Sequence, residues 1–407
     1  MKEEKALNKV FTNFGFHMYT EILFGKKTEE QVGQMIKKYG GTKVMIVYGE
    51  GSVKRMGLYD SVVKALNDEG IPFVELSGVK PNPRRSLVDV GLKMAHEENV
   101  DFFLGIGGAS SIDTAKAIAL GMANDDNYWQ FYVGTEPTKM APVGTIHTIS
   151  AAGSETSRSS VLLDDIETHK KYGFMYAPCR PVFAIMNPEL TYGVPAYQKG
   201  SGAADVFSHT VNRYFIDSVS YLSDQYGEST MRTVVKYAPL AIANPNDYES
   251  HAELMLAGSF SHNDLNSIGR CDPAHAGSEH AIETQLSGTY DTAHGAGLSV
   301  VMPAWLQYLV NHGEEKHVAR IAQFATNVFG VEPDYTDLKA VANEGLKRFR
   351  NWLTSIGMPI TLKGLGIPKE DLQSVIDLCN CDENGMISGF MDLDKNAVAE
   401  IFTSVVE

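Results

Sequence analysis

The sequence predicts an α/β domain built on a parallel sheet, followed by an all-helical domain. In the first half of the chain, short apolar runs alternate with helical patterns, and glycine turns connect them. This alternation is typical of βαβ units and a parallel, Rossmann-like sheet. Beyond about residue 190 almost every segment has helical periodicity instead. We therefore expect one domain at residues 1–190 and a second at residues 191–407.

The expected strands are apolar runs that end at glycine, proline or polar turns, and the expected helices lie between them. In the first half we expect strands at 43–48, 72–76, 101–106 and 145–149, and helices at 61–66, 88–99 and 112–122. In the second half we expect helices at 201–215, 226–243, 251–267, 303–310, 317–329, 337–355 and 369–378.

Composition narrows the class of protein. The 407 residues are 43% hydrophobic and 21% charged, as in ordinary globular proteins. The formal charge of -15 argues against nucleic-acid binding, which favours a basic face. The charged first residues do not resemble a signal peptide, and the apolar run at 298–310 is too short to span a bilayer. Four cysteines without a CxxC pair predict reduced thiols, and we expect a cytoplasmic protein with no membrane partner.

Two glycine turns each follow an expected strand and precede a helix. Glycine lets the backbone approach a pyrophosphate, and the next helix presents free N–H groups. Neither turn completes GxGxxG, and for either one a tight connection with positive φ is the alternative. Their occurrence together favours a dinucleotide. The turns are Gly49-Glu50-Gly51-Ser52 and Gly105-Ile106-Gly107-Gly108-Ala109-Ser110.

Glu50 bears on the choice of dinucleotide. A carboxylate after the first strand can accept a hydrogen bond from a ribose 2′-hydroxyl and repels a 2′-phosphate. Ser52, Lys54 and Arg55 favour the phosphate instead. We therefore expect NAD, with NADP left open.

A second group of residues has the chemistry of metal ligands. Asp205 and His209 are four residues apart in an apolar segment, so a helix places them on one face. His280 and His294 are 14 apart, and Gly288 and Gly295 predict a helix that ends, a turn, and a second helix near His294. A divalent cation would satisfy these side chains, and a hydrogen-bonded Asp–His pair with surface histidines is the alternative. One carboxylate and three imidazoles suit Fe²⁺, Zn²⁺, Mn²⁺ or Ni²⁺.

These features together resemble the iron-containing alcohol dehydrogenase family, in particular its butanol dehydrogenase and aldehyde reductase branch, over nearly the whole length. The matching segments are Tyr48-Gly-Glu-Gly-Ser-Val-Lys54, Pro81-Asn-Pro83, Gly107-Gly-Ala-Ser-Ser-Ile-Asp-Thr-Ala-Lys116, Ala152-Gly-Ser-Glu155, Asn187-Pro-Glu189, Asp205 to His209, and His280 to His294 running on to Pro303-Ala-Trp305.

The resemblance implies a dinucleotide-binding domain, a helical domain, a site in the cleft, and a homodimer. It implies that Asp205, His209, His280 and His294 bind one divalent metal, with Fe²⁺ expected first. It also implies that the cofactor is held by two sets of residues. Gly107 to Asp113 would cradle the pyrophosphate, and Gly49 to Ser52, Asn82, Thr148 and Lys171 would line the rest.

The chain departs from the family pattern near the third ligand. Members commonly have a second histidine four residues after it, where this chain has Thr284, and the tryptophan expected before His280 is absent. Ala109 and Ala152 replace a glycine and a threonine. Threonine cannot titrate near neutral pH, so the proton would pass through water, Thr284 or another histidine such as His275.

The expected reaction is hydride transfer between a nicotinamide cofactor and a small alcohol or aldehyde, with a metal as Lewis acid. Two alternatives remain. One is altered chemistry on the same scaffold, such as polyol oxidation or NAD-assisted elimination. The other is a cofactor-binding protein with little catalysis.

Overall fold

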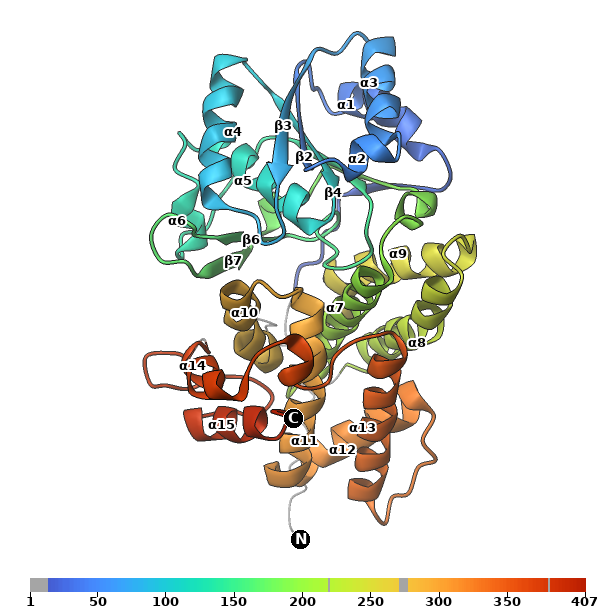
Figure 1. The fold of residues 1–407 in the computed structure, drawn as a ribbon. Coiled ribbons are helices and arrows are strands. Elements are labelled where there is room, and N and C mark those ends of the chain that lie inside the picture. The colour runs from blue at the N-terminus through green and yellow to red at the C-terminus, as the bar shows by residue number, and fades with distance from the viewer. Residues whose placement is uncertain (1–13, 219, 271–276, 380) are drawn as a thin grey trace. The chain divides into compact units, whose positions relative to one another are not determined.

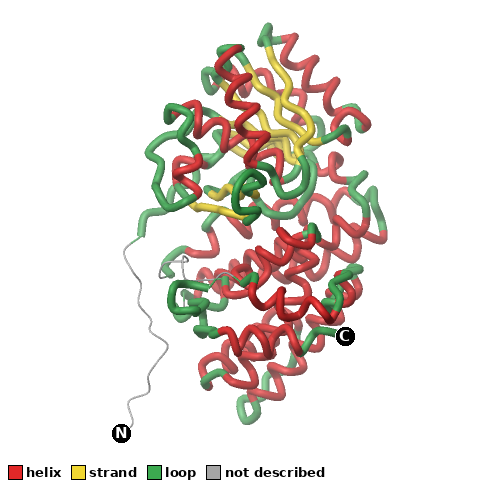
Figure 2. Tube along the Cα trace, turned by 60° about the vertical axis from the view of Figure 1, so that its left-hand side comes forward, coloured by secondary structure: helices red, strands yellow, loops and turns green. Residues whose placement is uncertain are grey.

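The computed structural model describes residues 14–218, 220–270, 277–379 and 381–407. The chain packs into two compact units. His17–Val194 and Pro245–Asn263 form the first, and Pro195–Asn244 and Asp264–Glu407 belong to the second. Figure 1 labels most of their helices and several of their strands, and Figure 2 shows that the strands gather in one part of the chain and that helices make up most of the rest.

The first unit is built on a six-stranded sheet in which every pairing is parallel. The strand order is β1-β8-β5-β4-β2-β3. The strands are β1 (Glu21–Phe24), β2 (Val44–Gly49), β3 (Phe73–Val79), β4 (Phe102–Gly107), β5 (Val143–His147) and β8 (Phe183–Met186). The order reverses between β2 and β4, because the chain runs from β2 to the β3 edge and then returns to the other side of β2. Ligands of open α/β sheets bind at such a point.

Both faces of this sheet are buried, which explains why its strands have continuous apolar runs. In β2, Met45 and Val47 pack into one hydrophobic core, while Val44 and Ile46 pack into another. Helices α4 and α5 contribute to the first core, and α1 and α3 to the second. The helices of this unit are α1 (Val32–Lys38), α2 (Ser52–Arg55), α3 (Leu58–Asp68), α4 (Arg85–Glu97), α5 (Ala109–Ala123), α6 (Trp129–Tyr132) and α9 (Tyr248–His262).

A two-stranded antiparallel hairpin follows the sheet's fifth strand, formed by β6 (Ser159–Leu163) and β7 (Lys171–Met175). The segment that leads into it is held by the fully buried Lys116. Its Nζ donates to the carbonyl oxygens of Ser154 at 2.7 Å, Ser157 at 3.1 Å and Ser159 at 2.8 Å, and to Ser154 Oγ at 2.9 Å. A buried ammonium group needs such partners, so this lysine fixes the path of the chain into the hairpin.

The second unit is helical in its described part, apart from loops and one isolated bridge. Aromatic residues fill its core: Phe207 stacks on Phe349 with ring centroids 4.9 Å apart, and Trp305 is buried beside Phe215. Its α-helices are α7 (Ala196–Tyr214), α8 (Tyr221–Ala243), α10 (Ser278–Tyr290), α11 (His294–His312), α12 (Glu315–Phe329), α13 (Leu338–Ser355), α14 (Leu372–Asp377) and α15 (Lys395–Thr403). Among the described helices, none is both long and apolar enough to cross a membrane.

The predicted fold class is confirmed: a parallel sheet with helices on both faces comes first, and a helix-rich part follows. Several boundaries were wrong. The strand expected at 145–149 is β5, which ends at His147. The helix expected at 251–267 ends at His262, since Asp264 has a φ of +73°, which an α-helix cannot accommodate.

The helix expected at 303–310 is the second half of α11, which begins at His294 and continues through Pro303. Gly288 does not end α10. That helix continues to Tyr290 and ends where Asp291 takes a φ of +50°. The expected arrangement of a helix, a turn and a second helix near His294 is therefore present, with its turn three residues later than Gly288.

Candidate metal and dinucleotide sites

Helix α7 positions the first two predicted ligands. The helix begins after Pro195, whose extended backbone leads into the first turn. Asp205 and His209 are one turn apart, and each is 6% exposed. His209 Nε2 lies 3.7 Å from Asp205 Oδ1. The expected shared face of the helix is therefore present, and it is buried.

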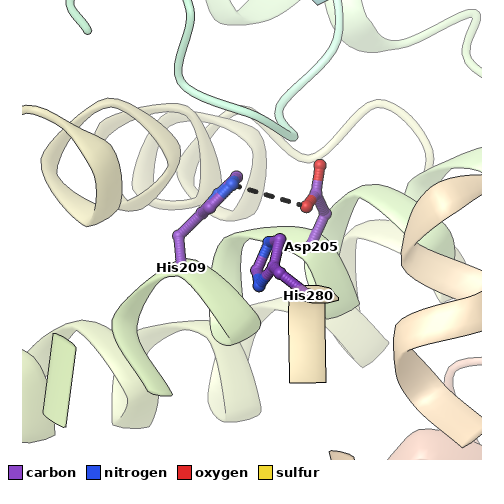
Figure 3. A group of neighbouring side chains, drawn as sticks. All are labelled: Asp205, His209 and His280. Carbon is purple, nitrogen blue, oxygen red and sulfur yellow. Dashed lines mark ion pairs between the residues drawn. The ribbon is translucent and has the colours of Figure 1, made fainter. Parts of the chain in front are cut away.

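His280 joins them from the first turn of α10. Asp205, His209 and His280 each offer one ligand atom, and these atoms all lie within 4.8 Å of one another. The rings of His209 and His280 are stacked with centroids 5.3 Å apart. Figure 3 shows the two side chains of α7 turned toward each other and His280 beside them from a second helix.

His294 lies next to this group at the start of α11. Its ring centroid is 5.3 Å from that of His280, but among the described side chains it is not one of the three whose ligand atoms converge. Its Nδ1 forms an ion pair with Glu283 Oε2. The structure therefore brings three of the four predicted ligands together and places the fourth beside one of them.

Helix α11 packs closely against α7 and α10, and one glycine permits each contact. A Cβ at Gly295 would overlap the carbonyl oxygen of Ser201 in α7, one turn before Asp205. A Cβ at Gly297 would overlap Oε1 of Glu283. The glycines after His294 thus let the helix that carries it approach the ligand helix, and they leave room for a buried carboxylate.

Two buried glutamates on α10 were missed in the sequence. Glu279 and Glu283 are both fully buried, and Oε1 of Glu279 lies 3.0 Å from Nδ1 of His280. Their spacing of four residues, beginning directly before His280, is the signal that could have revealed them, since it places both on one helix face. They add two carboxylates to the group and, with Asp205, bring the number beside the histidines to three.

The pKa of His280 reflects this charge. Burial lowers the pKa of its imidazole, but the hydrogen bond and charge of Glu279, followed by the charges of Asp205 and Glu283, outweigh burial and raise it. The surroundings of this histidine therefore favour a positive charge. A proton or a metal ion can supply it.

The donor set fits a divalent metal. Nε2 of His280 is buried and makes no hydrogen bond within the described part of the chain, and the same holds for Oε2 of Glu279. A buried imidazole nitrogen and a buried carboxylate oxygen are costly without partners. A cation held by Asp205, His209 and His280 would satisfy the nitrogen and offset the negative charge.

Thr284 occupies the position at which the family pattern has a second histidine. Its Oγ1 donates to the carbonyl oxygen of His280 at 2.7 Å, so its proton is engaged within α10. The hydroxyl oxygen retains lone pairs that can accept. His275, the other residue considered for the proton path, lies outside the described residues.

The two predicted glycine turns lie side by side in the first unit. Tyr48 of β2 is in register with Ile106 of β4, so Gly49 and Gly107 end neighbouring strands at the same edge of the sheet. Gly51 and Gly107 have φ values of +153° and +143°, which other residues rarely adopt. Both turns therefore come together at the reversal of strand order.

The turn after β4 leads into the 15-residue helix α5, whose N-cap is Gly108 and whose first residues are Ala109 and Ser110. The N–H of Thr148, which follows β5, donates to the carbonyl oxygen of Gly107 at 3.0 Å. Three strand ends thus meet where the helix presents its unpaired N–H groups. Such an edge can bind a pyrophosphate.

The remaining predicted cofactor residues have different surroundings. Glu50 is exposed after β2, and Asn82 has a φ of +56° in the loop after β3. Lys171 begins β7 and is 9% exposed. Asp113 is buried, and its carboxylate accepts from Ser154 Oγ at 2.5 Å and from the N–H of Val161 at 2.9 Å. Asp113 therefore holds the segment before the hairpin.

A parallel α/β sheet with a glycine-lined edge and a helical unit with a carboxylate–histidine group are the features expected of a two-domain dehydrogenase. Comparison with known proteins identifies the family. Residues 20–188 match the model of the iron-containing alcohol dehydrogenases, and residues 200–406 match that of the C-terminal part of the same family. The chain belongs to the iron-containing alcohol dehydrogenase family.

Characterised relatives match over almost their full length. The chain is 36% identical to NADH-dependent butanol dehydrogenase A of Clostridium acetobutylicum, covering 96% of this chain and 98% of that protein. It is 30% identical to the NADPH-dependent aldehyde reductase YqhD of Escherichia coli, covering 92% and 94%. The crystal structure of NADH-dependent butanol dehydrogenase A from Thermotoga maritima has a TM-score of 0.90 at 36% identity, covering 98% of this chain and 99% of that one.

Proposed function

We propose that this protein is a metal-dependent, NAD(P)-linked alcohol dehydrogenase or aldehyde reductase that acts on small alcohols or aldehydes. The observation that carries the proposal is the convergence of Asp205, His209 and His280 around a buried imidazole nitrogen without a hydrogen bond in the described chain. The activities named for the relatives from C. acetobutylicum and E. coli support the same reaction class.

The ion would be held by Asp205, His209, His280 and His294. A bound divalent metal would act as a Lewis acid toward the oxygen of the substrate. Fe²⁺ is the ion proposed first, in keeping with the family, and Zn²⁺, Mn²⁺ and Ni²⁺ suit the same donors. The protein's own contribution is to fix the imidazoles, which it does by placing them on α7, α10 and α11, with His209 buried and His280 and His294 half-buried.

The dinucleotide would lie on the glycine-lined edge of the sheet. Residues 107–110 and the first N–H groups of α5 would bind its pyrophosphate, with residues 49–52, Asn82, Thr148 and Lys171 around the rest. Asp113 would contribute indirectly, because it fixes the segment from Ser154 to Val161 by hydrogen bonds. The nicotinamide would supply or accept the hydride. Residues 1–190 would therefore bind the cofactor, and residues 191–407 would bind the metal.

NAD is the proposed cofactor, with NADP as the alternative. The exposed carboxylate of Glu50 follows β2, where it can accept a hydrogen bond from a ribose hydroxyl and would repel a 2′-phosphate. Among the relatives, both NADH-dependent and NADPH-dependent enzymes occur. A homodimer and a cytoplasmic location stay predictions.

The proton step is proposed to be slow. The Thr284 hydroxyl is engaged with the carbonyl oxygen of His280, and threonine does not titrate near neutral pH. The proton would therefore move through water, through Thr284 after rotation, or through another histidine. Loss of a positioned acid or base typically lowers rates by roughly 10²–10⁴-fold.

An assay of NADH and NADPH oxidation with short-chain aldehydes tests the proposal. Under anaerobic conditions, with Fe²⁺, Zn²⁺ or Mn²⁺ supplied, we expect aldehyde-dependent loss of absorbance, with NADH preferred. Absence of oxidation with every aldehyde and metal, despite measurable cofactor binding, would contradict it.

A second candidate is a reaction on the same scaffold in which the cofactor is regenerated, as in an NAD-assisted elimination. The loss of a titrating side chain at Thr284 is the observation that favours it. Product formation without net change in NADH would separate this reaction from oxidation or reduction of an alcohol or aldehyde.

A further inference from the structure

Two buried carboxylates contact the Nδ1 atoms of two histidines that we propose as metal ligands. Glu279 Oε1 is 3.0 Å from Nδ1 of His280, and Glu283 Oε2 forms an ion pair with Nδ1 of His294. Both glutamates are fully buried and lie one turn apart on α10. Neither is among the residues that we assign to the metal. The contact at His280 is a hydrogen bond and the contact at His294 is an ion pair, so a carboxylate lies beside Nδ1 of both histidines.

A carboxylate on Nδ1 fixes the tautomer of the ring. An ionised carboxylate only accepts hydrogen bonds, so Nδ1 must carry the proton and the lone pair of the neutral ring is on Nε2. At His280 this is the nitrogen that is buried without a hydrogen bond in the described chain. Asn212 Nδ2 also lies 3.2 Å from Nδ1 of His280. The Asn212 amide could donate to Nδ1 only if that nitrogen were unprotonated, so the two neighbours favour opposite tautomers. Hydrogen bonds to a charged carboxylate are roughly twice as strong as neutral ones, so Glu279 sets the protonation of this nitrogen.

A purely structural role leaves the burial of these carboxylates unexplained. Oε2 of Glu279 receives no hydrogen bond from the described residues, although it is buried. The chain has the same type of pair at its surface, where His312 Nε2 lies 2.6 Å from Glu400 Oε1 and both side chains are exposed. Carboxylate–imidazole pairs thus do not need burial to form. At Glu279 burial places a carboxylate, one oxygen of which receives no hydrogen bond from the described residues, next to the proposed ligands.

We propose that Glu279 and Glu283 are positioning residues that hold His280 and His294 through Nδ1, direct Nε2 toward the metal, and raise the affinity of the site for a divalent cation. The proposal rests on the metal site proposed above. Such outer carboxylates orient the ring and increase its basicity as a ligand, and their loss typically lowers metal affinity by about 10–100-fold. Glutamine in their place can also donate, so it no longer enforces the tautomer.

Titration of the metal-free protein with Co²⁺ tests the proposal. Three variants are compared with the parent: E279Q, E283Q, and E400Q as the matched control on the exposed pair with His312. The readouts are the dissociation constant, the visible spectrum of bound Co²⁺, and the unfolding temperature of the metal-free protein. We expect E279Q and E283Q to weaken Co²⁺ binding by about 10–100-fold and to change its spectrum. E400Q should change neither.

The metal-free unfolding temperature separates positioning from a structural role. Because Glu279 is buried and incompletely partnered, E279Q should leave this temperature unchanged or raise it. Affinity and spectrum equal to those of the parent, or a fall in metal-free stability that accounts for weaker binding, would overturn the proposal. If E279Q does not fold, E283Q provides the same test at His294. A parent that binds no Co²⁺ would overturn the metal site itself, and the present inference with it.

Discussion

The hydroxyl of Thr284 donates to the carbonyl oxygen of His280 at 2.7 Å, one turn earlier in the same helix. Residue 284 is one helical turn from His280, a proposed metal ligand. Because this residue is a threonine, it has no group that titrates near neutral pH. Thr284 is half-buried, so the side chain at this position is in partial contact with solvent. The proposed metal site therefore has no titrating group at this position.

Replacing Thr284 with histidine should accelerate turnover. An imidazole can exchange protons near neutral pH, so T284H should raise kcat for aldehyde reduction by about tenfold or more, within the range of general acid–base effects. The rise should depend on pH through the new group. Steady-state kinetics across pH 5–9 check this expectation, with T284V as the control that removes the hydroxyl without adding a base. An unchanged kcat in T284H would count against the account of the proton step.

The contact between α11 and α7 should tolerate no side chain at residue 295. In G295A the new Cβ would overlap the carbonyl oxygen of Ser201, so we expect a loss of about 1–3 kcal/mol in the free energy of unfolding and weaker metal binding. In the control variant G227A the added Cβ meets its nearest neighbour, Thr210 Cγ2, at an ordinary contact distance of 3.4 Å. Denaturant unfolding and metal content measure both effects. Equal stability of the two variants would contradict the packing argument.

The carboxylate of Glu50 should set the preference for NADH. In E50G the repulsion of a 2′-phosphate disappears, and the ratio of kcat/KM for NADPH to that for NADH should rise by about tenfold or more, as charge interactions of 1–4 kcal/mol allow. The exposed Glu97 at the end of α4 provides the control variant E97Q. A ratio that stays constant in E50G would place the selectivity elsewhere.

Buried Lys116 should make stability depend on alkaline pH. Burial removes water from its ammonium group and lowers its pKa to about 8, despite the nearby Asp113 and Glu155. In the unfolded chain the group keeps its proton up to about pH 10.4. Between pH 8 and 10.4 the unfolded state therefore binds more protons, and stability rises with pH.

The rise attributable to Lys116 is on the order of 3 kcal/mol at most. Other groups titrate in the same range, so the quantity to measure is the difference in unfolding free energy between the parent and K116M at each pH. We expect that difference to shift in favour of the parent from pH 8 to pH 10. The variant K93M, at an exposed lysine, should show no such trend. A pH-independent difference for K116M would contradict the lowered pKa.

The fold class could be predicted because its strands are buried on both faces. Val44 to Val47 form a continuous apolar run, and the glycine turn that follows gives the strand–turn–helix pattern. Short edge elements could not be predicted in this way. Strand β1 is only four residues long and lies at the sheet edge, and the β6–β7 hairpin depends on Lys116, which is distant in sequence.

The candidate metal site could be predicted only in part. Asp205 and His209 share a helix, so their spacing was sufficient to place them together. His280 and His294 lie on two further helices, and their proximity to each other depends on packing at Gly295 and Gly297. The spacing of Glu279 and Glu283 could have indicated that they share a helix face, but not that they are buried beside the histidines. Their complete burial was apparent only in the structure.

Metal dependence is the central claim, and one comparison tests it most directly. NADH oxidation with butanal is measured anaerobically for protein stripped by a chelator, for the same protein supplied with Fe²⁺, and for D205N treated alike. The account predicts that the stripped protein is inactive, that Fe²⁺ restores turnover, and that D205N binds less Fe²⁺ and stays nearly inactive. Stripped protein that oxidises NADH at the rate of the Fe²⁺-supplied protein would contradict the account.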